Sequence, residues 1–358
     1  MKRYTIASII LLSCLVLPAV ELKKIDTVLL APGEGEDDFI AAAAPFAVTE
    51  DDLYLIPDYK AGDIKVYDMK GRFVKRVGRR GVGPNELMEP RQSDYVDGKF
   101  VVLDMGRRQY TLYQRDKDAV LKEFKHLRSI YMGNDVAMMK DNQALFSGYV
   151  PGKDGTEWRC FTYDFNTGQY NYLADIATFF GFSSDKEYQK ARKDISIIGS
   201  QGYCDWWGDY AYLIWRGNLK IMKINMKTRE MESFGKKTEN YLQPTATERK
   251  RKALRERNLR VLGEEAGKYS DIMGLYTNKD YLLLMYNKPR VKGEEVNSRM
   301  LQFYTLDGTF INELQITHGT GCVLFLSKDK NDDILYMLHP GEAEDYQEYL
   351  VSRFKIVK

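Results

Sequence analysis

The feature that most constrains the fold of this chain is a repeated pair of short strands. Each strand alternates apolar and polar residues, and a tight turn rich in Gly, Asp or Asn joins the two. The repeats occupy residues 64–77, 110–124, 159–173, 221–234, 301–314 and 349–357. A small four-stranded sheet cannot bury both of its faces alone. Six such units in succession therefore predict an all-β fold, a closed six-bladed β-propeller.

The two ends of the chain are expected to meet in one blade. The chain ends at Lys358 before the sixth unit has an outer strand, whereas Ile25–Leu30 has strand character and no partner nearby in sequence. We expect this N-terminal strand to lie beside Tyr349–Ile356 and close the last blade, which leaves no open edge at the seam. Residues 24–358 then form a single propeller domain.

The connections between strands differ in length in a regular way. Turns inside each strand pair are short, as at Asp68–Gly71, whereas the other connections include long segments such as 179–199 and 235–269. In a propeller all of these long connections emerge on one face, which we expect to carry the function. Two of them contain capping boxes that predict short helical insertions, starting at Ser184 and at Thr245. The second helix is basic, so it is either a solvated lid or a platform for an anionic partner.

The first twenty residues read as an export signal. Lys2 and Arg3 precede an apolar run that extends from Ile6 to Val20. The string ending at Cys14 resembles a bacterial lipobox, so lipidation of Cys14, plain cleavage and an uncleaved anchor all remain open. The protein is expected to be exported, and to be periplasmic or associated with the outer membrane.

Charge, cysteine and histidine usage exclude several function classes. The chain has 53 basic and 51 acidic residues, so no overall field selects nucleic acid or an anionic membrane. The widely spaced Cys160, Cys204 and Cys322 are expected to be buried free thiols. No histidine lies at metal-ligand spacing from another, and no cofactor motif is present, so we expect neither a metal nor a cofactor.

The sharpest local motif is the glycine-rich string between the first two units, which extends from Gly78 to Pro90. Its glycines do not open a helix, and no P-loop lysine follows, so a nucleotide site is excluded. The string resembles a signature of the NHL-like six-bladed propeller proteins of the Bacteroidetes, many of which are exported lipoproteins, with Asn85 where that family usually has Gly. This resemblance implies the fold, an exported location and a ligand-binding role, and it transfers no catalytic residues.

Candidate ligand-binding residues map to the long-loop face. Two tryptophans there could form a stacking platform, and six arginines suggest an anionic or polyhydroxylated ligand, although salt-bridged loops would explain the arginines equally well. These residues are Trp158, Trp215, Arg80, Arg91, Arg107, Arg108, Arg216 and Arg290. Two carboxylates near the starts of inner strands, Asp94 and Asp271, could face the channel or pair with these arginines.

Three functions remain open at the level of sequence. The leading hypothesis is a monomeric, non-catalytic protein that binds a glycan, a peptide or an envelope protein through the long-loop face. The second is a glycan lyase or hydrolase, with His318 and His339 as weak candidates for acid/base groups, because a lone loop histidine is usually only solvated. The third is a structural subunit that docks on an envelope complex through the 245–262 helix.

Overall fold

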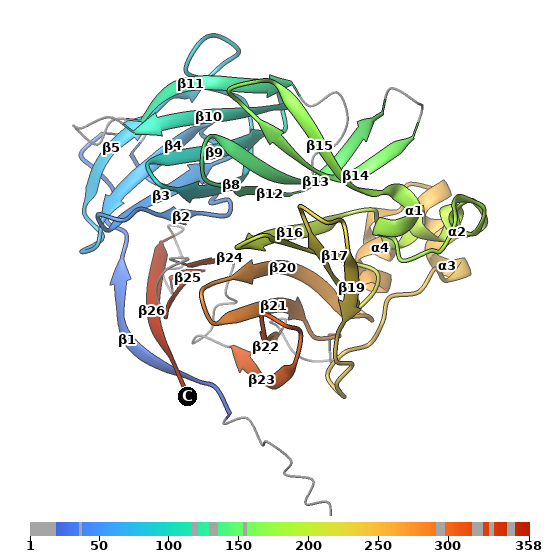
Figure 1. Ribbon diagram of the computed structural model, residues 1–358. Coiled ribbons are helices and arrows are strands. Elements are labelled where there is room, and N and C mark those ends of the chain that lie inside the picture. Colours follow the sequence, from blue (N-terminus) through green and yellow to red (C-terminus); the bar gives the residue numbers. More distant parts are fainter. Residues whose placement is uncertain are drawn as a thin grey trace, which may run out of the picture.

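Six four-stranded antiparallel sheets form a ring in the computed structural model, so the chain is a six-bladed β-propeller (Figure 1). The structure describes residues 19–35, 38–115, 121–128, 135–152, 156–290, 298–316, 325–328, 333–341 and 348–358. Each blade orders its strands from the central channel outward, and a blade is here numbered by its place along the chain. The predicted fold class is confirmed.

The strands follow a regular order from blade to blade. Blades 1 to 3 contain β2 (Ala47–Val48), β3 (Leu53–Asp58), β4 (Asp63–Asp68), β5 (Phe73–Val77), β8 (Pro90–Val96), β9 (Lys99–Asp104), β10 (Gln109–Arg115), β11 (Leu121–Arg128), β12 (Asp135–Met138), β13 (Gln143–Pro151), β14 (Glu157–Asp164) and β15 (Gln169–Asp175). Blades 4 to 6 contain β16 (Gly202–Trp207), β17 (Tyr210–Trp215), β18 (Ile221–Asn225), β19 (Met231–Phe234), β20 (Asp271–Thr277), β21 (Tyr281–Asn287), β22 (Arg299–Thr305), β23 (Phe310–Ile316), β24 (Phe325–Lys328), β25 (Ile334–Pro340), β26 (Tyr349–Val357) and β1 (Glu21–Leu29).

The N-terminal strand closes the ring, as the sequence predicts. β1 pairs antiparallel with β26 from Glu21 opposite Val357 to Leu29 opposite Leu350. An ion pair between Arg353 and Asp26 ties the two strands further, and it holds the pKa of Asp26 below its usual value. Blade 6 is thus assembled from both ends of the chain, so its outer edge depends on the first strand.

The core is divided among the spaces between blades. Every pair of neighbouring blades encloses its own cluster of buried apolar side chains, and aromatic rings are prominent in them. Between blades 6 and 1, for example, the Tyr54 ring packs edge-on against Tyr336 at a centroid distance of 6.1 Å. The buried thiols Cys160 and Cys204 belong to the cluster between blades 3 and 4 and are both free, as predicted. Cys322 lies outside the described residues.

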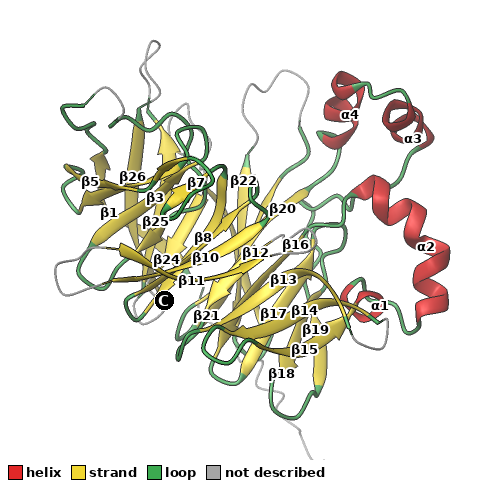
Figure 2. Cartoon of the chain, turned by 90° about the horizontal axis from the view of Figure 1, so that it is seen from above, coloured by secondary structure: helices red, strands yellow, loops and turns green. Residues whose placement is uncertain are grey.

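All described helices lie in connections of the long-loop face and gather on one side of the ring (Figure 2). Between blades 3 and 4 the chain forms α1 (Ile176–Phe179) and α2 (Asp185–Ile198), and Ser184 caps α2 as predicted. Between blades 4 and 5 it forms α3 (Glu248–Arg255) and α4 (Leu259–Ala266).

The second insertion differs from its prediction in two respects. Its cap is Thr247 rather than Thr245, because the Thr247 hydroxyl accepts the Lys250 N–H. The expected single helix is a hairpin, since Arg257 has a φ of +53° and Asn258 starts a new helix by accepting the Val261 N–H.

The glycine-rich string forms a tight link between blades 1 and 2. Its short strands β6 (Arg79–Arg80) and β7 (Glu86–Leu87) pair in parallel. The Glu86 carboxylate folds back under the loop, accepting the Gly83 N–H at 2.7 Å and pairing with Arg79. A Cβ at Gly81 would meet this carboxylate at 2.0 Å, and Asn85 adopts a φ of +54°. The motif is therefore a structural turn, and Asn85 occupies a position that favours glycine because the backbone there is left-handed.

Among the described helices, none combines the length and the apolar character needed to cross a membrane.

Candidate functional site

A cavity of about 1000 Å³ opens at the centre of the long-loop face. Its wall is built from the starts of inner strands, the ends of second strands and the last turn of α2, so every blade from 1 to 5 contributes. Blade 6 contributes Tyr349 at the start of β26. The lining combines aromatic rings with charged groups and hydroxyls, which is a composition suited to ligands that bear both apolar faces and polar groups.

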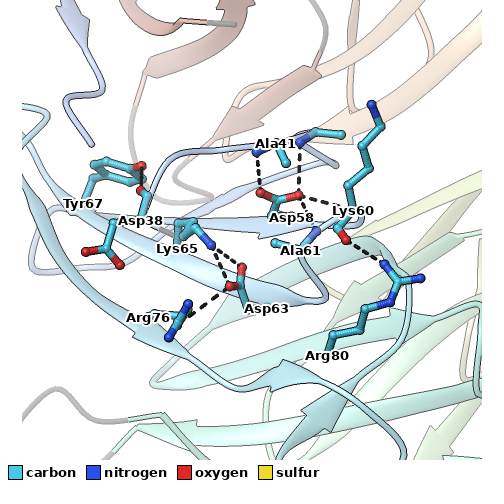
Figure 3. A network of polar contacts seen from close by, with 11 residues as sticks. Asp38, Ala41, Asp58, Lys60, Ala61, Asp63, Lys65, Tyr67, Arg76 and Arg80 are labelled. Carbon is cyan, nitrogen blue, oxygen red and sulfur yellow. Dashed lines mark hydrogen bonds and ion pairs between the residues drawn. The ribbon is translucent and has the colours of Figure 1, made fainter. Parts of the chain in front are cut away.

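Two buried aspartates shape this wall in the same way, since the carboxylate of each accepts several backbone N–H groups. Asp58, at the end of β3, accepts the backbone N–H groups of Ala41, Ala42, Lys60 and Ala61 (Figure 3). Asp104, at the end of β9, likewise accepts the N–H groups of residues 88, 89 and 107. Each carboxylate thereby fixes the approach to its inner strand and the adjoining loop, because these backbone donors would otherwise be unsatisfied.

Three further aspartates link neighbouring inner strands around the channel. Asp94 accepts the Met138 N–H at 2.8 Å, Asp135 accepts the Cys204 N–H at 2.9 Å, and Asp205 accepts the Thr277 N–H at 2.6 Å. All three residues line the cavity. Their hydrogen bonds link blade 2 with blade 3, blade 3 with blade 4, and blade 4 with blade 5, so they stabilise the shape of the channel. The same carboxylates give the channel wall an acidic character.

One wall of the cavity carries a stacked arginine. The Arg91 guanidinium lies 3.8 Å from the centroid of the Tyr59 ring and pairs with Glu89, with 2.9 Å between Nε and Oε1. Each of the two charged side chains is about two-fifths exposed (42% for Arg91 and 39% for Glu89), so this group faces the opening. The arrangement presents a planar cation on an aromatic face, which favours carboxylate, hydroxyl or amide groups of a ligand.

A second arginine lies on the blade 4 side of the cavity. Arg216 Nε donates to Asp271 Oδ1 at 2.7 Å, and Arg216 also donates to the side chain of Gln201. Lys250 of α3 lies near this pair, and its pKa is lowered, chiefly by burial and then by the positive charge of Arg216. The region therefore holds two cations beside two acidic groups, Asp271 and Glu265, and Arg216 is the cation that borders the cavity, where it can donate to a hydroxyl or anionic group of a ligand.

Close to Asp58 lies a buried ion pair inside blade 1 (Figure 3). Lys65 Nζ is 2.8 and 2.6 Å from the two carboxylate oxygens of Asp63, and the side chains are 0% and 3% exposed. An Arg76 nitrogen lies 4.0 Å from the same carboxylate. Burial raises the pKa of Asp63 to about 6, even though Lys65 acts to lower it.

Of the predicted arginines, Arg91 and Arg216 line the central cavity. Two of the others hold loops around it. Arg80 donates to the Lys60 carbonyl at 2.6 Å, and Arg107 donates to the Glu86 carbonyl at 2.6 Å. Arg108 is exposed and occupies a turn at a φ of +52°.

The remaining predicted groups lie away from the central cavity. Trp158 stacks on Tyr172 with 5.0 Å between ring centroids, and Arg290 is exposed beside Gly267, to which its N–H donates. Trp215 lines a second, smaller cavity. His339 is buried in blade 6, where its Nε2 lies 2.9 Å from Ser352 Oγ. His318 and Cys14 lie outside the described residues.

Most of the basic side chains of α3 take part in ion pairs within the helical insertions. Arg249 pairs with Glu264 and with the buried Glu265, and Arg251 pairs with Asp194 of α2. The second insertion is thus fastened to the first, whose last turn lines the cavity. This arrangement supports the interpretation of a docked lid more than that of a free basic platform.

Sequence reasoning missed several residues of the cavity. Tyr59 and Tyr203 line it outside any recognisable motif, and Glu89 lies in the glycine-rich string, whose residues indicate only a tight turn. A usable signal did exist at Asp58 and Asp104, because each aspartate ends an apolar strand and precedes a turn on the long-loop face. Within the described part of the chain, no group of three or more His, Cys, Asp or Glu side chains is placed to hold a metal ion.

Comparisons with known proteins show the fold and leave the family open. No family model matches the sequence, and no curated protein matches it. Among solved structures, a member of the DUF4221 family from Bacteroides vulgatus has a TM-score of 0.63 at 12% identity, over 95% of this chain and 99% of that one. A "putative exported protein" from Bacteroides fragilis has a TM-score of 0.60 at 12% identity, over 95% and 96%. The structure of U3-55K has a TM-score of 0.52 at 8% identity, over 93% of this chain and 99% of that one.

Proposed function

We propose that this protein is an exported, non-catalytic binding protein of the cell envelope that takes a polyhydroxylated ligand with an anionic group, such as an acidic glycan, in its central cavity. The observation that carries the proposal is the cavity itself. It combines about 1000 Å³ with an arginine stacked on a tyrosine on one wall and a second arginine across the ring. Aromatic rings suit the apolar faces of sugars, and arginine suits carboxylate and hydroxyl groups.

Other observations favour binding over acid/base catalysis. Asp94, Asp135 and Asp205 already accept backbone N–H groups, which commits part of their hydrogen-bonding capacity to the channel wall. His339 is buried beside Ser352 rather than in the cavity lining. We therefore favour binding, and the enzymatic alternative becomes an outcome of the test.

The exported location rests on the N-terminal apolar run and agrees with the naming of the Bacteroides fragilis neighbour. Membership of the NHL-like class and lipidation at Cys14 belong to the same proposal. Mass spectrometry of the protein purified from membranes tests the lipid, since a diacylglyceryl group on Cys14 adds a defined mass that a Cys14→Ala variant cannot carry.

The binding proposal is tested by a screen of acidic and neutral glycans, followed by titration of the strongest ligand. Arg91→Ala and Arg216→Ala are expected to weaken binding roughly 10- to 100-fold each, because a hydrogen bond to a charged group contributes about 1.5–3 kcal/mol. Arg72→Ala is the matched control, since Arg72 is an exposed arginine paired with Asp68 in a short turn on the opposite face.

Two results would contradict the proposal. One is binding that both cavity variants leave unchanged while their melting temperatures match the parent. The other is release of shortened glycan products by the parent protein, which would assign the cavity to an enzyme. Capture of an envelope protein instead of a glycan, lost on removal of residues 245–262, would favour the docking-subunit alternative.

A further inference from the structure

A second cavity, here called the side slot, lies between the first helical insertion and the outer strands of blade 4. It has a volume of about 290 Å³ and opens to solvent. Its roof is the segment from Thr178 to Ser183, which includes the end of α1 and the loop before α2, and its floor includes Met222 of β18 and Met231 of β19. Figure 1 shows α1 beside β14 and β15, at the junction of blades 3 and 4.

The position of the side slot follows from propeller geometry. Radial sheets diverge outward, so the core cluster between blades 3 and 4 fills the inner part of their interface with residues such as Leu145 and Leu213. Farther out, blade 4 presents Met231 and the small Ser233 on the same face. The α1 segment covers the gap from the long-loop side without filling it.

The apolar part of the side-slot wall consists of aromatic and thioether groups, and polar residues such as Ser183 and Asn218 complete the wall. Phe179, Phe180 and Trp215 are each more than nine-tenths buried and pack together, with 5.1 Å between the ring centroids of Phe180 and Trp215. Trp215 is held in place because its Nε1 donates to the Gly199 carbonyl at 2.7 Å. Met231 is 45% exposed, which places a flexible apolar side chain at the opening. Methionine and aromatic side chains adapt well to aliphatic ligands.

Two charged residues border the side slot, and they differ in whether they form an ion pair. Glu232 is paired with Lys223 at 2.6 Å between Oε1 and Nζ. Lys220 also lines the side slot and is exposed, and no ion pair joins it to any residue that the structure describes. Its aliphatic stem lies alongside Gly181, 3.9 Å from the point where a Cβ would be. An apolar recess thus ends at an accessible cation.

We propose that the side slot binds the aliphatic chain of an anionic amphiphile, with the carboxylate of that ligand on Lys220. The volume is roughly twice the 150 Å³ that accepts benzene in an engineered protein cavity, which suits a medium-length chain rather than a folded polymer. This site is separate from the central cavity, although Trp215 and Arg216 are adjacent residues that line one each.

The test is calorimetric titration of the full exported protein with decanoate and with decan-1-ol, both below the micelle concentration. The parent is expected to bind decanoate with a change in tryptophan fluorescence. Lys220→Glu should weaken decanoate at least tenfold and leave decan-1-ol nearly unchanged, because only the carboxylate meets the lysine. Met231→Glu should abolish binding of both, and its exposed position leaves the fold intact.

The matched control is Lys140→Glu, which reverses an exposed lysine in the short turn between β12 and β13 on the opposite face. Arg91→Ala should bind decanoate as the parent does, which separates this site from the proposed glycan site. The proposal is overturned if the parent does not bind decanoate, if Met231→Glu binds it unchanged, or if Lys220→Glu and Lys140→Glu weaken it equally.

Discussion

Removing the cation from the buried pair in blade 1 tests the electrostatics of this propeller most directly. In Lys65→Met the Asp63 carboxylate loses a partner at 2.6–2.8 Å, and the nearest other cation is the Arg76 nitrogen at 4.0 Å. Both members of the pair are almost fully buried. Removing one partner of such a pair costs about 3–5 kcal/mol, since an uncompensated charge stays behind, so we expect a loss of that size in the free energy of unfolding at pH 8.

The raised pKa of Asp63 determines how the loss of stability in Lys65→Met depends on pH. The pKa of Asp63 is raised from 3.8 to about 6 in the folded protein, so between these values the folded state binds the proton that the unfolded state has released. Stability contributed by this carboxyl is therefore present below pH 4 and falls as the pH rises through 6, by up to about 3 kcal/mol. In Lys65→Met the pKa of Asp63 rises further, so the loss should be large at pH 8 and small at pH 5, where the carboxyl is neutral.

Chemical unfolding at the two pH values measures both effects. Adding Asp63→Asn to the Lys65→Met variant should recover most of the stability, because no buried charge remains. Lys227→Met is the matched control. It removes a lysine whose Nζ lies 2.8 Å from Asp209 but which is exposed, and it should cost at most about 1 kcal/mol. A cost of less than 1 kcal/mol for Lys65→Met at pH 8, or an equal cost at both pH values, would refute this reasoning.

Two other predictions concern the closure and the first blade link. Deletion of residues 19–29 removes β1 and exposes the edge of β26, so we expect the whole domain to melt at a much lower temperature; an unchanged melting temperature would show that closure is dispensable. Asn85→Gly should be neutral or stabilising by a few tenths of a kcal/mol, while Asn85→Val should destabilise by about 1–2 kcal/mol, because the φ of +54° penalises a β-branched residue. Equal unfolding midpoints for the two variants would contradict a strained backbone at this site.

The fold could be predicted from local chemistry because each blade repeats the same signals. Alternating strands and tight turns such as Asp68–Gly71 are set by nearby residues, and the unpartnered strand before residue 30 pointed to closure. The helix cap was harder to place, since Thr245 and Thr247 are both plausible caps in sequence. Only the observed bond from the Lys250 N–H to Thr247 decides between them.

The site could be predicted only in part, because its properties arise between blades. Arg91 and Arg216 could be placed on the correct face, and the expected pairing of Asp271 with an arginine is observed at Arg216, but the stacking of Arg91 on Tyr59 depends on a contact across 32 residues of chain. His339 illustrates the reverse case. Its position at the end of β25 suggested a loop group, whereas the β-sheet turns its ring toward Ser352 of the adjacent strand.

The N-terminal end of β1 and the central cavity lie on opposite sides of the propeller. Glu21 at the start of β1 lies beside Val357 at the end of β26, whereas Tyr349 at the other end of β26 borders the central cavity. Anything attached ahead of residue 19 therefore leaves from the side remote from the cavity. Glu21 follows Cys14 by seven positions in the sequence, a span that reaches at most about 25 Å when fully extended. A lipid on Cys14 would therefore hold the short-turn side close to the bilayer, and the mouth of the central cavity would face away from the bilayer.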